Sequence, residues 1–174
     1  MTATRVVRAA ELALPGFAVG LVAGVTAGAL ALIVGQPVAW AVTTALTLGL
    51  PLGLFGGGYG LLIVHGRVRI GGFAPVALYW LAAFPAARLV HEILTRLVLT
   101  GHAGLPDDPL GFVAYQGIIS AGFAIGFLWL HERIAPRWWH RVAARNPRAE
   151  HVCARYAAHA QQLRTARRTS GRRR

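Results

Sequence analysis

Apolar residues are grouped along the chain into four long runs separated by short polar or charged segments. The runs cover about residues 12–35, 38–64, 70–90 and 109–130. Because a helix rises 1.5 Å per residue, about 20 apolar residues are needed to cross roughly 30 Å of hydrocarbon. Each run has about this length or more and is nearly free of charged side chains. The pattern predicts an all-α, polytopic membrane protein with four transmembrane helices in a bundle.

The same pattern divides the chain into two parts. Residues 1–133 are expected to form the transmembrane domain, and residues 134–174 are expected to form a basic helical tail with amphipathic character. The last residues, 169–174, are polar, charged and terminal, so they are expected to be disordered.

Composition supports membrane insertion, since hydrophobic residues make up 55% of the chain and charged residues only 14%. A soluble domain usually has about 25% charged residues. Residues 131–174 contain 12 arginines and two acids, which leaves a net charge of +10 in that segment.

Further arginines, Arg5, Arg8, Arg67 and Arg69, fall in segments that four spans would place on the same side as this tail. The positive-inside rule then predicts that both termini of a plasma-membrane protein are cytoplasmic. One alternative is that the first span is a cleaved signal peptide ending near residues 29–31, although its apolar stretch is longer than usual.

Glycines recur at four-residue spacing in the first span, which places them on one helical face. Small residues there let two helices approach closely in lipid. The predicted packing glycines, which resemble a glycine zipper, are Gly16, Gly20, Gly24, Gly28, Gly49, Gly53, Gly57, Gly122 and Gly126. Packing inside one bundle is the favoured interpretation, and a self-association face is the alternative.

The second span contains Pro51 and the glycine-rich residues 56–60. Proline removes one backbone hydrogen bond and favours a kink. A broken helix that exposes backbone groups to a substrate is the alternative.

Charged residues lie at and after the end of the third span, and they provide the best candidate for an ion or substrate site. Arg88, Glu92 and Arg96 are four residues apart, and His91 lies beside them. We expect Pro85 to change the chain direction, so that these residues belong to an amphipathic helix at the outer interface. The functional alternative is a buried cluster for proton or substrate passage.

Other chemistry receives little support from the sequence. His65 and His131 are expected at the water boundary, which argues against haem ligation between them, and no zinc-type spacing is present. Ser120 has no histidine or acid nearby in sequence. Cys153 has no second cysteine with which to form a disulfide. We therefore expect no metal, no cofactor and no catalytic residues.

The start of the tail combines arginine with tryptophan, a combination typical of a membrane surface. The predicted surface for lipid or a partner consists of Arg133, Arg137, Trp138, Trp139, Arg141 and Arg145. Arginines near the surface attract anionic headgroups, and tryptophans anchor helices at the interface. An acidic protein partner is an alternative, and nucleic acid is a weaker one because no recognised binding module is present.

Three functional classes remain open on the sequence. The favoured one is a structural or accessory component that binds other membrane proteins, a second copy of itself, or anionic lipid. The alternatives are a small oligomeric transporter or channel, and a membrane enzyme that acts on a lipid-like substrate.

Overall fold

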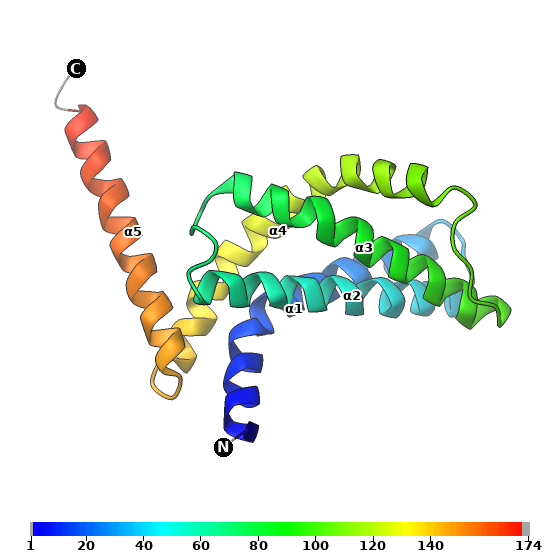
Figure 1. Cartoon of the computed structure of the whole chain (residues 1–174), viewed down its shortest axis with the longest axis horizontal. Helices are drawn as coiled ribbons and strands as arrows, with labels where there is room; N and C mark the ends of the chain where they lie inside the picture. The colour runs from blue at the N-terminus through cyan, green and yellow to red at the C-terminus, as the bar shows by residue number, and fades with distance from the viewer. Residues whose placement is uncertain (1, 172–174) are drawn as a thin grey trace.

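The computed structural model describes residues 2–171, and this part of the chain contains five helices and no strand (Figure 1). The helices are α1 (Thr2–Ile33), α2 (Val38–Val64), α3 (Phe73–Thr100), α4 (Pro109–Val142) and α5 (Pro147–Gly171). Four of them are long and apolar enough to cross a membrane: Thr4–Ile33, Val38–Val64, Phe73–Thr100 and Pro109–Val142. The predicted fold class is confirmed, and the chain is a multi-pass membrane protein.

An antiparallel hairpin of α1 and α2 forms one half of the bundle (Figure 1). The turn between them uses Gly35, whose φ of 82° lies in the left-handed region that favours glycine. Along the hairpin, a Cβ atom added at Gly16, Gly20 or Gly24 would overlap the backbone of α2. The two backbones therefore lie in direct contact, which only glycine permits.

The facing glycines of α2 are also closely packed, although less tightly. A Cβ at Gly53 would lie 2.9 Å from the ring of Phe17, and one at Gly57 would lie 3.2 Å from Ala13 Cβ. Gly122 and Gly126 of α4 behave differently, because a Cβ at either would meet nothing within 4 Å. The expectation that these two glycines pack inside the bundle is wrong, since α4 turns them away from its neighbours.

Aromatic rings fill the space between the hairpin and the second half of the bundle, α3 and α4. Trp80 of α3 is fully buried and packs against Phe123 and Phe127 of α4, with ring centroids 4.5 and 4.7 Å away. Tyr59 of α2 meets Phe127 edge-on at 5.4 Å. Tyr79 donates a 2.6 Å hydrogen bond to the Phe55 carbonyl, so α3 is tied to α2 by a polar contact as well as by packing.

Prolines lie inside four of the helices, at Pro15, Pro51, Pro85 and Pro136. The first part of α1 turns away from the hairpin axis (Figure 1), as expected near a proline. At Pro85 the structure differs from the sequence expectation: α3 continues to Thr100 as one helix. No separate interfacial helix forms, because a proline in a membrane helix is tolerated when neighbouring helices pack around it.

Helix α5 begins against the bundle and then leaves it (Figure 1). Its first turns are packed, with Ala149 and Val152 fully buried, whereas most later residues are exposed. The predicted disorder from residue 169 is wrong for residues 169–171, which continue the helix. Residues 172–174, where the rest of that prediction falls, lie outside the described part of the chain.

Candidate functional site

A buried polar cluster joins α2 to α3 within their membrane-spanning lengths. Thr47 Oγ1 lies 2.8 Å from His91 Nδ1 and 3.0 Å from Thr95 Oγ1, and it donates a 2.7 Å hydrogen bond to the Thr43 carbonyl. A hydroxyl has one proton. With that proton donated to the Thr43 carbonyl, His91 Nδ1 is the donor in its contact with Thr47.

The charged residues around His91 face the interior more than the sequence suggested. Arg88, Glu92 and Arg96 are each partly buried, and Glu92 pairs with Arg96 at 3.0 Å. The opposite side of α3, at Val90, Leu94, Leu97 and Val98, is the exposed one. The side chains of Arg96 and Glu92 are 40% and 30% exposed, so the charges form a partly buried cluster beside the buried His91.

His131 departs furthest from its expected place at the water boundary. It is fully buried in α4, in ring contact with Tyr59, Phe127 and Trp139 at 5.3–5.8 Å. Neither ring nitrogen has a hydrogen-bond partner within the described part of the chain. His65, in contrast, is exposed and accepts a 3.0 Å contact from Arg148. The two histidines therefore do not face each other.

The indoles of Trp138 and Trp139 are directed into the protein and donate to α1. Trp138 Nε1 donates to the Glu11 carbonyl at 2.7 Å, and Trp139 Nε1 donates to the Leu12 carbonyl at 3.0 Å. Pro15 has no N–H, so the Glu11 carbonyl lacks its normal donor four residues on. Trp138 supplies that donor from another helix.

This contact corrects the prediction that both tryptophans lie on the lipid or partner surface. Trp139 is fully buried, and Trp138 is partly buried. The signal that could have revealed their role was the proline inside the first apolar run, which leaves a carbonyl that needs a donor.

The four arginines of the predicted surface divide into two groups. Arg133, Arg137 and Arg141 are exposed, and Arg133 lies 5.4 Å above the ring of Trp129. Arg145 is also exposed, but it pairs with Glu11 at 2.7 Å. The first three remain available at the surface, whereas Arg145 helps to hold α1 against the end of α4.

The start of α5 is fixed to three other helices at this end of the bundle. Asn146 Nδ2 donates to the Arg8 carbonyl of α1 at 3.0 Å, and Arg155 donates to the Ile63 carbonyl near the end of α2 at 2.7 Å. Tyr156 donates to Glu132 of α4 at 3.0 Å. Burial is the main reason that the pKa of the Tyr156 hydroxyl is raised, and the neighbouring Glu132 adds to the effect.

We call this end, where α1 begins and α4 ends, the basic end of the bundle.

Among the described residues, no group of three or more histidine, cysteine or acidic side chains could hold a metal ion. No protein-family model, curated protein or solved structure matches the chain.

Proposed function

We propose that this chain is a non-catalytic accessory protein of the plasma membrane. In this proposal its basic end lies in the cytoplasm, where it binds anionic lipid headgroups, and its membrane-embedded surface binds another membrane protein. Two features support the proposal: the uneven distribution of charge, and a helix surface on α4 that no other described helix of the chain covers.

The observation that carries the proposal is the segregation of arginine. The connection between α2 and α3 contains Arg67 and Arg69, and α1 begins with Arg5 and Arg8. The connections at the opposite end, residues 34–37 and 101–108, contain no arginine. Because cytoplasmic loops are enriched in arginine, this asymmetry favours a cytoplasmic basic end.

The contacts of α5 support a surface function for this end. Helix α5 is held by side-chain hydrogen bonds to α1, α2 and α4, so the arginines nearby are presented from packed helices. Exposed Arg133, Arg137 and Arg141 are each expected to contribute about 1 kcal/mol to attraction for anionic lipid. Changing all three to glutamine should lower the retention of phosphatidylglycerol without preventing membrane insertion.

A surface for a protein partner is available on α4. Gly122 and Gly126 face away from the other helices of the chain, and nearby Ile118 and Ile125 are 77% and 59% exposed. Glycine is a poor residue for an unpartnered helix, but it permits close contact with a second one. The occupant we propose is a transmembrane helix of another protein.

Replacement of Gly122 and Gly126 by leucine tests this surface. Neither leucine would meet its own chain within 4 Å at Cβ, so the fold should survive while the partner is lost on affinity purification. Ala82→Leu, at an exposed position of α3, is the matched control and should retain it. Loss of self-association alone would identify the occupant as a second copy, and an unchanged set of copurifying subunits would refute the proposed surface.

A transporter is the second candidate, favoured by the cluster of His91, Thr47 and Thr95 with Arg88 and Glu92 beside it. Buried ionisable residues in membrane helices commonly mark ion pathways. Under this hypothesis Glu92→Gln abolishes flux in proteoliposomes, whereas Glu150→Gln, on exposed α5, leaves it intact. If the Glu92→Gln variant retains flux, the proposed transport site is refuted.

A further inference from the structure

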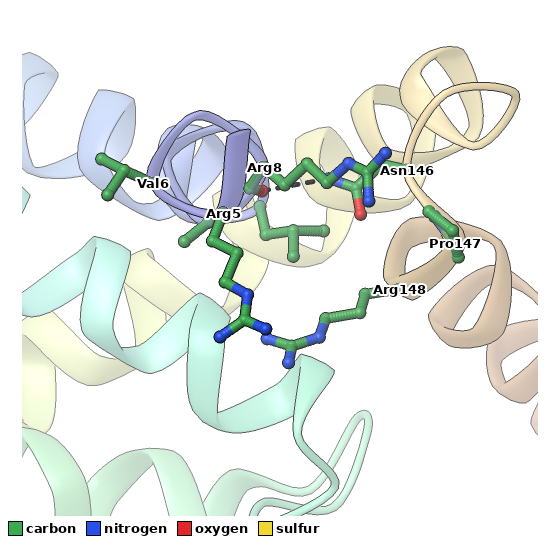
Figure 2. Close-up of a pocket in the computed structure, with 8 residues that line it drawn as sticks. Arg5, Val6, Arg8, Asn146, Pro147 and Arg148 are labelled. Carbon is green, nitrogen blue, oxygen red and sulfur yellow. Dashed lines mark hydrogen bonds between the residues drawn. The ribbon is translucent and has the colours of Figure 1, made fainter. Parts of the chain in front are cut away.

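A cavity of about 700 Å³ lies between the start of α1 and the start of α5. Figure 2 shows that the side chains of Arg5 and Arg8 enter it from α1 and that of Arg148 from α5. The guanidinium groups of Arg5 and Arg148 point toward each other across the opening (Figure 2). The cavity thus brings together cations that are more than 130 residues apart in sequence.

None of the described residues that line this cavity is acidic. Glu11, which the hydrogen-bond network links to Asn146, is already engaged by Arg145 at 2.7 Å and by Asn146 at 3.2 Å. Like charges held close together repel one another. An anion placed between the guanidinium groups would remove that repulsion and accept their hydrogen bonds.

Two contacts fix the walls of the cavity. Asn146 is 1% exposed and donates to the Arg8 carbonyl at 3.0 Å, which holds the start of α5 against α1. Arg148 Nη1 lies 3.0 Å from His65 Nε2, which acts as the acceptor. The N-terminus of α5, with Pro147 at its first position, also directs its positive dipole end toward this region.

The remaining lining is apolar and identifies the kind of anion. Val6, Ala9 and Leu12 form the wall that α1 contributes. Leu12 is fully buried and is the residue at which the first apolar run begins. A cavity with guanidinium groups above and aliphatic side chains at the edge of the membrane matches a phosphate that is attached to acyl chains.

We propose that this cavity binds the phosphate of one anionic phospholipid headgroup, with Arg5, Arg8 and Arg148 as its ligands. Arginine suits this role because its planar donors match phosphate oxygens. The inference rests on the proposed cytoplasmic, lipid-binding basic end and adds a discrete site to it. The site is separate from the exposed arginines at 133, 137 and 141, which do not line the cavity.

The test uses the full chain in nanodiscs of phosphatidylcholine with a minor fraction of phosphatidylglycerol, released into a mass spectrometer under native conditions. The wild type should retain one phosphatidylglycerol in preference to phosphatidylcholine. At about 1 kcal/mol per arginine, each change to glutamine should weaken this preference about fivefold. The double variant Arg5→Gln/Arg148→Gln should therefore lose roughly 30-fold.

Two further variants separate the site from general charge and from misfolding. Arg67→Gln/Arg164→Gln removes the same charge from exposed positions that line no part of this cavity and should retain the bound lipid. Arg5→Gln/Arg8→Gln changes side chains that have no hydrogen bond or ion pair to another described residue. It should therefore lose the lipid while keeping the wild-type helical circular dichroism.

The outcomes are distinct. If wild-type protein retains no phosphatidylglycerol over phosphatidylcholine and binds no glycerol phosphate, the proposed lipid-binding function fails together with the site. If the preference exists but is equally reduced by the cavity and surface variants, only the site is refuted. If glycerol phosphate binds the wild type in phosphatidylcholine discs and phosphatidylglycerol is not retained, the site serves a soluble phosphate, and the lipid assignment is overturned.

Discussion

The contact between Trp138 and the proline break of α1 gives a prediction whose size can be worked out. Pro15 leaves the Glu11 carbonyl without a donor in its own helix, and Trp138 Nε1 donates to that carbonyl at 2.7 Å. Trp138→Phe keeps an aromatic ring but removes the N–H. The carbonyl would then be unsatisfied in a partly buried position.

The expected cost has two parts that a second substitution separates. An orphaned buried acceptor costs about 1–3 kcal/mol, and the smaller ring adds a loss of packing. In a Pro15→Ala background the backbone N–H restored by alanine can donate to the Glu11 carbonyl, so Trp138→Phe no longer orphans it. The packing loss remains. The difference between the two backgrounds should therefore be about 1–2 kcal/mol.

Unfolding of the four proteins of this cycle in mixed detergent micelles, followed by far-ultraviolet circular dichroism, gives the coupling. Trp129→Phe is the control, because Trp129 is 64% exposed and donates no hydrogen bond to the described chain. Its substitution should change stability by less than about 0.5 kcal/mol. A Trp138→Phe cost that is the same in the wild-type and the Pro15→Ala backgrounds would refute the proposed capping role.

Three further predictions concern other parts of the chain. Gly20→Ala should destabilise the protein by about 1–3 kcal/mol, because the added Cβ would overlap the α2 backbone. Gly122→Ala should be neutral or stabilise by up to about 1 kcal/mol. Equal thermal stabilities of the two variants would contradict this account. His131→Phe should be neutral or stabilising, because both buried ring nitrogens lack partners; a thermal-unfolding loss beyond about 2 kcal/mol would mean that the imidazole is needed. Burial raises the pKa of the Cys153 thiol, so less thiolate exists at neutral pH. Alkylation by iodoacetamide should therefore be slower than for a cysteine peptide, and its rate should increase as pH rises. Alkylation faster than that of the peptide would show that the thiol is activated.

The sequence was sufficient to predict the four spans, because the length of an apolar run is a local property and decides whether a helix can cross the hydrocarbon core. It also located the close approach of α1, since glycines at four-residue spacing must share a face. It could not tell whether Gly122 and Gly126 face a neighbour within the chain. That depends on the rotation of α4, which the aromatic contacts of Phe123 and Phe127 decide.

The candidate sites were less accessible to sequence reasoning. Arg88, His91 and Glu92 were identified, but the partner Thr47 lies 44 residues before His91 and had no pattern of its own. Arg148 and Arg5 come together through the packing of the start of α5, which Asn146 and Arg155 hold to α1 and α2. Pairings between distant segments of this kind follow from tertiary packing, which no local spacing encodes.

Native mass spectrometry of the tagged protein, extracted gently from its own membrane, tests the proposed accessory function most directly. The account predicts a foreign membrane subunit at fixed stoichiometry, released by leucine at Gly122 and Gly126, together with bound anionic phospholipid. A chain that appears only alone or as a homo-oligomer, without anionic lipid, would contradict the account. Arg88, His91 and Glu92 would then become the first residues to test for transport.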